Sequence, residues 1–434
     1  MRANFRIPLL AAFLSLFASF ALAGDQTKPG PGNSNAANLA SQSPVVQSAF
    51  GFLIDQTGGL QGSKLRNETF DAITNPDTCV RHRAGLRPAD RQAILNTLLA
   101  QGLVDPNDDG TFPGGLITGV FPPVLNDNGP CPHLPQPFYS APGSVYHGHH
   151  SYPGGLPVHE SNNDVSDAHL ADQYRAVYGH TGILGLPTID GNVLWETTDQ
   201  IQNRDTAIYL DQDVIVGAPI WHDWAKSIVF QWFSDGTEFQ ELNFGGNGST
   251  DNYGGSGNSK TGGHHIMSIA EAMARGLSPA FVITQASAHS NPTSGNEYKV
   301  VNWLRAAAIM ARIDPVAKGY LMIDGNGNYR LPALRKLGSI NLGEVNALAE
   351  YELHNLSDAD FTFSGPAITG VEAVLQSLAS EFGYDPSDAS RYNNKYRNPV
   401  FSFMTAERLY IVYSQKGSKG VEVELRRLRN LGVI

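Results

Sequence analysis

The sequence has little cysteine and little charge. Only two cysteines occur among its 434 residues, which excludes a cysteine-rich zinc finger. Charged residues make up 16% of the chain, and acidic residues outnumber basic ones, so the formal net charge is -11. Long nucleic acids bind basic surfaces, and this acidity therefore argues against such a partner. The chain also lacks a Gly-x-x-x-x-Gly-Lys-Ser/Thr loop and a Gly-x-Ser-x-Gly turn, which excludes a P-loop nucleotidase and an α/β-hydrolase.

The first residues have the features of an export signal. Arg2 and Arg6 precede an apolar run from Ile7 to Leu22, and small residues follow it. We therefore predict a secretory signal over Met1–Ala23 and an exported protein, periplasmic or secreted, that has no membrane contact after cleavage. The apolar run is short for a spanning helix, which needs roughly 20 residues, but an uncleaved anchor is the alternative. Loss of the two arginines takes the formal charge from -11 to -13.

The two cysteines gain a role if the chain is exported. An oxidising compartment permits a disulfide between Cys79 and Cys131. Such a bridge would close a loop in the N-terminal region and stabilise the fold by roughly 2–4 kcal/mol. Two free buried thiols are the alternative.

Composition divides the rest of the chain into three parts. Residues 24–145 are rich in loop-forming residues, with a flexible leader predicted over Gly24–Ser43 and the clearest helix over Pro88–Gly102. Residues 146–317 combine apolar helical stripes with His and Asp at their ends. Residues 318–434 have a mixed pattern. We therefore predict a mainly α fold: a helical core between a loop-rich N-terminal region and a small α+β C-terminal region.

Four helices can be placed in the central part. The second extends to about Phe233, and Pro219 should kink it or mark its true start. The fourth carries its apolar stripe as far as Asp314. The predicted starts are Pro157, about Asp211, Ser278-Pro279 and about Asn296.

The C-terminal part contains a predicted helix over Gly365–Phe382. Arg408–Ser414 and Val421–Leu425 alternate like the strands of a hairpin with its turn at Lys416–Gly420. Asp324–Asn328 resembles the start of a calcium loop but lacks the later Glu, so a hairpin turn is the better interpretation.

The chemistry of this chain is concentrated in a series of histidines and carboxylates. His222 and Asp223 are adjacent, and neighbouring residues do not share one face of a helix, so both can bind one ion only where the backbone bends. Several imidazoles combined with few carboxylates favour a divalent transition metal such as Mn, Fe, Zn, Ni or Co. The other members of the series are His147, His149, His150, His159, His264, His265, His289 and Asp314.

Asp314 falls on the apolar stripe of the fourth predicted helix. An unpaired carboxylate on such a stripe is costly to bury, so a partner is required. A metal ion is one candidate. A salt bridge to Arg305 or Arg312, or a plain role at the helix end, is the alternative.

The order of these residues resembles that in the HD-domain superfamily of metal-dependent phosphohydrolases. The motifs are closest to those of the bacterial HD-domain 3′–5′ exoribonucleases. The family pattern is a His, a later His-Asp pair, often two more histidines, and a final Asp. Pro157 and Ala225 depart from it, where Leu and Gly are usual. The matching segments are His149-His150-Ser151-Tyr152-Pro153-Gly154-Gly155-Leu156-Pro157-Val158-His159, His222-Asp223-Trp224-Ala225-Lys226, Gly263-His264-His265-Ile266 and Ser287-Ala288-His289.

The resemblance implies a role for each residue. Asp223 would bridge two metal ions, or bind one where the centre holds a single ion. Asp223 and Lys226 would be the catalytic pair. His149 or His150 would bind the substrate. The implied metal ligands are His159, His222, Asp223, His264 or His265 (of which His265 is favoured), His289 and Asp314.

The function that the resemblance implies is hydrolysis of phosphate esters, either a small phosphodiester or a nucleotide, by a metal-bound hydroxide. The partner is then a small phosphorylated substrate. A di-iron oxygenase of the same superfamily and a non-catalytic metal-binding module are the alternatives. The sequence leaves the oligomeric state open.

Overall fold

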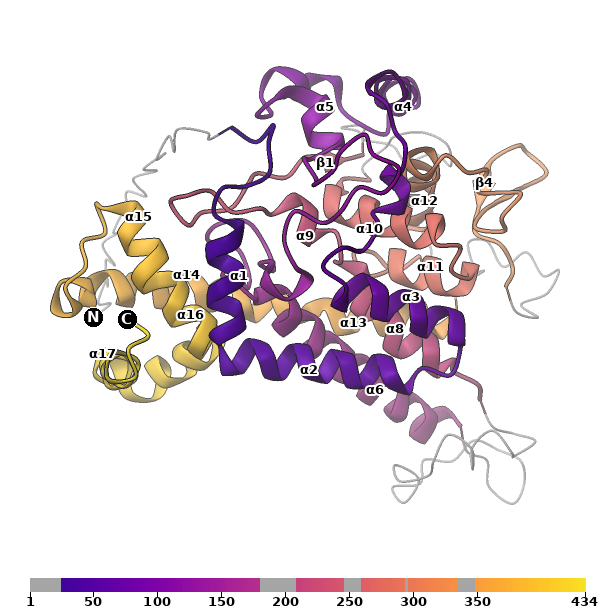
Figure 1. Ribbon diagram of the computed structural model, residues 1–434. Coiled ribbons are helices and arrows are strands. Elements are labelled where there is room, and N and C mark those ends of the chain that lie inside the picture. The colour runs from indigo at the N-terminus through magenta and orange to yellow at the C-terminus, as the bar shows by residue number, and fades with distance from the viewer. Residues whose placement is uncertain (1–24, 180–207, 246–258, 293–295, 335–347) are drawn as a thin grey trace, which may run out of the picture.

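The computed structural model describes residues 25–179, 208–245, 259–292, 296–334 and 348–434. Within these ranges the chain is mainly α-helical, as predicted, and its strands form two two-stranded antiparallel sheets. Figure 1 shows the N-terminal and central helices in one body, with the last helices gathered at one side. None of the helices in these ranges combines the length and hydropathy that crossing a bilayer requires. The predicted signal lies outside the described residues.

The N-terminal region is more helical than predicted. Helix α4 confirms the helix predicted over Pro88–Gly102, whereas α1 contradicts the flexible leader predicted over Gly24–Ser43. The reason is a side-chain anchor: Asn33 donates to the Pro135 carbonyl at 3.0 Å and accepts from the Trp232 N–H at 2.9 Å. The helices are α1 (Asn33–Gln42), α2 (Pro44–Gly59), α3 (Ser63–Thr74), α4 (Pro88–Ala100) and α5 (Gly115–Val120).

The central helices pack with α2 and α3 around the larger hydrophobic core. Two fully buried tryptophans fix α3 against the end of α8 and the segment that follows it. Trp221 Nε1 donates to Thr69 Oγ1 at 2.8 Å, and Trp224 Nε1 donates to the Ala72 carbonyl at 2.9 Å. The helices are α6 (Gly155–Tyr178), α8 (Gln212–His222), α9 (Lys226–Val229), α10 (Gly263–Ala274), α11 (Pro279–Ala286), α12 (Glu297–Ala311) and α13 (Ala349–Ser357).

The helix predicted over Asp211–Phe233 is two helices. Asp211 caps α8, which contains Pro219 and ends at His222. Asp223 leaves helical geometry, with φ -109° and ψ 9°, before the short α9 begins. The backbone therefore bends between His222 and Asp223, as two adjacent residues that bind one ion would need.

The other predicted starts are confirmed to within two residues. Pro157 lies in the first turn of α6. Ser278 caps α11, and its hydroxyl accepts from the Phe281 N–H. Helix α12 begins at Glu297.

The last helices have a hydrophobic core of their own. Helix α14 and the 3-10 turn after it confirm the helix predicted over Gly365–Phe382. The hairpin predicted over 408–425 is wrong, because this segment belongs to α17. Val421, Leu425 and Leu428 are buried there at helical spacing. The helices are α14 (Phe361–Leu378), α15 (Ala389–Tyr392), α16 (Asn398–Met404) and α17 (Ala406–Asn430).

The mistaken turn has a physical counterpart in α17. Gly417 stands inside this helix with φ 63° and ψ -167°, which is not helical geometry. Glycine adopts such a conformation without the steric cost that a side chain would add. The turn-like composition of this stretch therefore produces a kink between two helical segments.

The strands of the described chain form two short antiparallel pairs. Strands β1 (Asn243–Phe244) and β2 (Thr261–Gly262) pair directly before α10. Strands β3 (Met322–Ile323) and β4 (Tyr329–Arg330) flank the predicted turn, whose Asp324 Oδ1 accepts two backbone N–H groups at 2.9 Å. The hairpin prediction for Asp324–Asn328 is confirmed.

Cys79 and Cys131 form the expected disulfide in the N-terminal region. Their Cα atoms are 5.1 Å apart, within the range that disulfide geometry requires. A disulfide is compatible with an oxidising compartment and therefore with export.

Candidate metal centre

Five of the predicted ligands come together, and each lies near a helix end. His159 is the fifth residue of α6 and His222 is the last residue of α8, with Asp223 directly after it. His264 is in the first turn of α10, and His289 follows α11. Nitrogen and oxygen atoms of these side chains form overlapping groups in which all atoms lie within 4.8 Å of one another. Such groups can hold metal ions.

Two glycines let the loop before α6 approach the helix closely. Gly154 has φ 84°, and a side chain on it would collide with Val46. A Cβ atom on Gly155 would lie 1.9 Å from the His150 carbonyl oxygen. The Gly-Gly pair of the motif is therefore required by close packing, which fixes the loop beside His159.

The carboxylate of Asp223 faces two separate pairs of histidines. Its Oδ2 lies 3.2 Å from His159 Nε2 and 3.3 Å from His222 Nε2. Its Oδ1 lies 3.0 Å from His264 Nε2 and 4.0 Å from His289 Nε2. One buried carboxylate thus connects two halves of a single centre.

Asp358, which directly follows α13, completes the centre. Its Oδ1 lies 3.2 Å from His159 Nε2 and 3.3 Å from His222 Nε2, and its Oδ2 lies 3.9 Å from His289 Nε2. Asp358 was not among the predicted ligands. Leu353 and His354, in the helix that it follows, are fully buried, and this burial is visible only in the folded chain.

Asp314 does not take part in the centre, and its assignment as a ligand is corrected. It is exposed, and its Oδ1 accepts the N–H groups of Val316 and Ala317 at 2.9 and 3.1 Å. Helix α12 ends at Ala311, and Arg312 adopts φ 57°. The apolar stripe therefore stops before Asp314, which caps the following turn.

The first pair of histidines is oriented from behind through Nδ1. His159 Nδ1 lies 2.9 Å from Asp360 Oδ1. His222 Nδ1 donates to the Pro219 carbonyl at 2.8 Å and lies 3.1 Å from Glu160 Oε2. Carboxylates and carbonyls behind a metal-binding histidine fix its tautomer and leave Nε2 as the free ligand atom.

The second pair follows the same arrangement. His264 Nδ1 lies 2.5 Å from Glu241 Oε1, and His289 Nδ1 lies 2.9 Å from Thr261 Oγ1. All four histidines therefore have a partner at Nδ1 and present Nε2 to the two aspartates. This common orientation is the one that metal ligation needs.

His265, which the sequence analysis favoured over His264, has a different role. Its Nε2 donates to the Ala286 carbonyl at 3.1 Å, and its ring stacks on His289 with centroids 4.1 Å apart. His265 is fully buried and supports the His289 ring, while His264 faces Asp223. The choice between the two histidines is therefore corrected in favour of His264.

Both central carboxylates are charged although they are buried. Burial alone would raise the pKa of Asp223, but His222 and Lys226 hold it well below its usual range. Burial is likewise outweighed at Asp358, where His222 and His159 hold the pKa well below its usual value. Buried anions need cations nearby. Metal ions can supply that charge in place of the protons on the histidines.

Lys226 contributes the fixed positive charge of the site. Its Nζ forms a close ion pair with Asp223 Oδ2, three residues earlier in the chain. Burial disfavours the charged amine, but Asp223 raises the pKa of Lys226 above its usual value. Lys226 therefore remains positively charged beside the candidate ligands.

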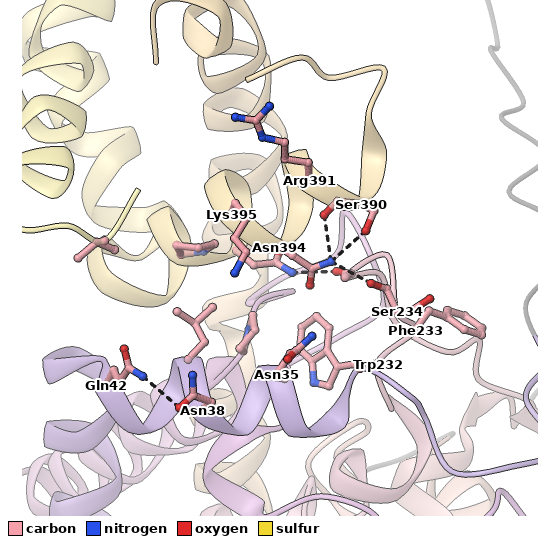
Figure 2. A pocket seen from close by; sticks show the side chains of 18 of the residues that line it. Asn35, Asn38, Gln42, Trp232, Phe233, Ser234, Ser390, Arg391, Asn394 and Lys395 are labelled. Carbon is pink, nitrogen blue, oxygen red and sulfur yellow. Dashed lines mark hydrogen bonds between the residues drawn. The ribbon is translucent and has the colours of Figure 1, made fainter. Parts of the chain in front are cut away.

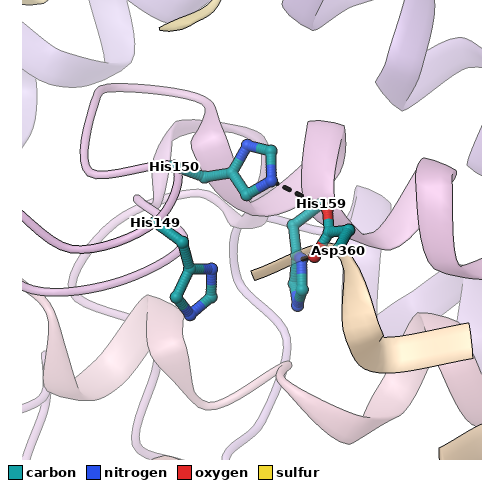
Figure 3. Close-up of side chains that lie close together, drawn as sticks. All are labelled: His149, His150, His159 and Asp360. Carbon is teal, nitrogen blue, oxygen red and sulfur yellow. Dashed lines mark hydrogen bonds and ion pairs between the residues drawn. The ribbon is translucent and has the colours of Figure 1, made fainter. Parts of the chain in front are cut away.

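A cavity of about 500 Å³ opens beside the centre, and His149 and His150 lie differently with respect to it. His149 lines the cavity, and its buried Nδ1 has no hydrogen-bond partner among the described residues. His150 does not line it, and its Nε2 lies 2.9 Å from Asp360 Oδ2. Figure 3 shows Asp360 with the rings of His150 and His159. Of the two predicted substrate-binding residues, only His149 is placed to contact a substrate in this cavity. His150 instead holds Asp360 in position.

A second cavity, of about 550 Å³, lies elsewhere and has no metal-ligating cluster. Amide side chains line it together with Trp232 and Lys395. Figure 2 shows it between α1 and the segment that carries Asn394. None of the predicted site residues lines this cavity.

Comparisons with family models, with curated proteins and with solved structures found no match. The function of the chain is therefore inferred from the side chains of the centre and of its cavity.

Proposed function

We propose that this chain is an exported metal-dependent phosphohydrolase of the HD type that hydrolyses a small phosphodiester or a nucleotide. The observation that carries the proposal is the position of Asp223. Its two carboxylate oxygens face separate pairs of histidine Nε2 atoms, and each histidine is oriented from behind through Nδ1. This geometry suits a carboxylate that is shared between two cations.

The donor set indicates the kind of ion. Imidazole nitrogens with two carboxylates favour Mn, Fe, Zn, Ni or Co over Mg or Ca, which prefer oxygen ligands. His159, His222, Asp223 and Asp358 would hold one ion, and Asp223 with the His264 and His289 pair would hold a second. Such ions activate water at neutral pH and neutralise charge on phosphoryl oxygens.

The surrounding side chains would orient the substrate. Lys226 places a positive charge next to Asp223, where it can stabilise negative charge that develops on a phosphoryl oxygen. His149 lines the same cavity, and burial lowers its pKa well below the usual value, so the ring is neutral. A neutral imidazole has one N–H group to donate to the ester.

The site is partly shielded from water. His159, His222 and Asp223 are almost completely buried, whereas the side chain of His289 is 24% exposed. The exposed side of the centre is therefore where an ester can enter. Low solvent access strengthens the interaction of the phosphate with the ligands and with Lys226.

Export of the protein is the second part of the proposal. It is supported by the predicted signal over Met1–Ala23 and by the Cys79–Cys131 disulfide. Secretion of the full-length chain from a host cell, with N-terminal sequencing of the product, tests it. Recovery of an intact N-terminus in the cytoplasm would contradict export.

The test of the enzyme is elemental analysis of protein purified without added metal, together with a screen of phosphate mono- and diesters. We expect one or two equivalents of a transition metal and ester hydrolysis, and we expect Asp223→Asn to lose both. Bound iron without hydrolysis would favour an oxygenase. Absence of any bound metal would favour a non-catalytic module.

A further inference from the structure

The cavity beside the centre has an apolar part that the metal ligands do not use. Leu356, Ala359 and Phe361 line it, and they flank the ligand Asp358 in the chain. Leu356 is 45% exposed and Phe361 is 51% exposed. Large apolar side chains that stay exposed in a pocket indicate a binding surface for an apolar group.

The apolar surface is close to the centre, because the His149 ring is near both Phe361 and His159. The ring centroid of Phe361 lies 6.2 Å from that of His149, and the His149 centroid lies 5.0 Å from that of His159. A phosphate at the centre therefore brings the first carbons of its organic group to Phe361. Two rings at such a spacing can pack against a third ring in offset or edge-on geometry.

Charge recognition is confined to the metal side of the cavity. Among the described lining residues, the charged side chains are the ligands, Lys226 and Glu241, and Glu241 is paired with His264. Asn355, on the apolar side, donates to the Ala288 carbonyl at 2.6 Å. The organic group is therefore recognised by apolar contact and not by an ion pair.

We propose that the substrate is a small phosphate ester whose organic group carries an apolar or aromatic ring close to the phosphate, and that Phe361 and Leu356 bind this ring. The inference rests on the proposed function. In the reaction, the P–O bond to the ring-bearing alcohol breaks, water supplies the hydroxyl group to phosphorus, and its proton goes to the alcohol oxygen. A cavity of about 500 Å³ suits a substrate of this size.

The experiment compares a ring-bearing ligand with a small one. Calorimetry on metal-loaded protein measures the Kd of benzylphosphonate and of methylphosphonate, neither of which can be hydrolysed at the phosphorus–carbon bond. Kinetics on benzyl phosphate and methyl phosphate follow, because both release alcohols of similar acidity. We expect benzylphosphonate to bind about tenfold more tightly than methylphosphonate.

Two phenylalanine variants make the test specific to the apolar surface. Phe361→Ala should lose most of the tenfold difference, with metal content measured in parallel. Phe363→Ala is the matched control. Phe363 is 44% exposed, packs edge-on against Tyr410, and is not a lining residue of the cavity. Its removal should leave the preference for benzylphosphonate intact.

Two results would overturn the proposal in different ways. Equal affinity for the two phosphonates, or an unchanged preference in Phe361→Ala, overturns the substrate class, while hydrolysis of methyl phosphate keeps the proposed function. If metal-loaded protein binds neither phosphonate and hydrolyses none of the phosphate mono- and diesters in the screen, the proposed function fails and the substrate class fails with it.

Discussion

Glu241 holds His264 at two points. Its Oε1 accepts the backbone N–H of His264 at 2.7 Å and lies 2.5 Å from the ring Nδ1. Burial would lower the pKa of His264, but Glu241 and Asp223 raise it to about 9. The carboxylate therefore fixes both the first turn of α10 and the direction of the ring.

Removal of this anchor should weaken metal binding without unfolding the protein. For Glu241→Ala we expect a roughly 10- to 100-fold loss of metal affinity in the half of the centre that contains His264. Competition with a chromogenic chelator measures it. Glu241→Gln keeps an acceptor oxygen and should lose less. Equal affinity in Glu241→Ala and the unmodified protein would show that the anchor has no effect on the ion.

Asp358 and Asp314 offer a direct choice between two ligand sets. Asp358→Asn removes a charge that faces three histidines, so we expect it to lose metal and activity. Asp314→Asn alters an exposed turn cap and should keep full metal content. Elemental analysis of both variants decides the matter. Loss of metal in Asp314→Asn alone would restore the ligand set that the sequence suggested.

Lys226 should matter for turnover more than for metal content. It neutralises charge but offers no lone pair while it is protonated, so Lys226→Met should keep the ions and lower kcat by about 10- to 1000-fold. Lys226→Arg keeps the charge on a differently shaped group, so its kcat should lie between those of Lys226→Met and the unmodified protein. Steady-state kinetics and elemental analysis on the same preparations measure this. Parallel losses of metal and kcat in Lys226→Met would show that the residue is structural.

A buried ion pair that is not part of the centre should control stability in acid. Burial would raise the pKa of Glu271, but its hydrogen bond with His82 and the charge of Arg275 lower it to about 2. The folded value lies below the ordinary value of 4.5, so the stabilisation is present above pH 4.5 and is lost as the pH falls toward 2. The shift corresponds to about 3 kcal/mol.

Denaturant unfolding at a series of pH values tests this linkage. The unmodified protein should lose stability steeply between pH 4.5 and 2, and Glu271→Gln should show a shallower loss over the same interval. Glu381→Gln, at a half-exposed pair with Arg426, is the control and should keep the steep slope. Identical slopes in Glu271→Gln and the unmodified protein would contradict the assignment.

The central part of the chain was the most predictable from sequence. His159, His222, Asp223 and His289 come together because their motifs combine chemistry with a local signal, either a helix start or a helix end. The bend at Asp223 could be deduced because adjacent side chains cannot share a helix face. The HD-type function stays a prediction, since order and spacing indicate chemistry without proving it.

The errors arise where a local pattern does not report how the backbone folds or which distant segments pack together. The spacing in the sequence placed Asp314 on an apolar stripe, but the helix ends at Ala311 and the backbone at Arg312 is no longer helical. The segment around Gly417 looked like a turn between strands, yet the apolar positions on either side pack at helical spacing. Asp358 was missed because its partners lie in helices distant in sequence, and only tertiary packing brings them together.

The place of Asp358 in the chain has a consequence for how the protein matures. The ligands are spread from residue 159 to residue 358, so a growing chain cannot assemble the centre until most of it has been made. A chain exported in an unfolded form would therefore take up its metal only where it folds. The metal supply of that compartment, and not that of the cytoplasm, would then decide which ion the protein carries.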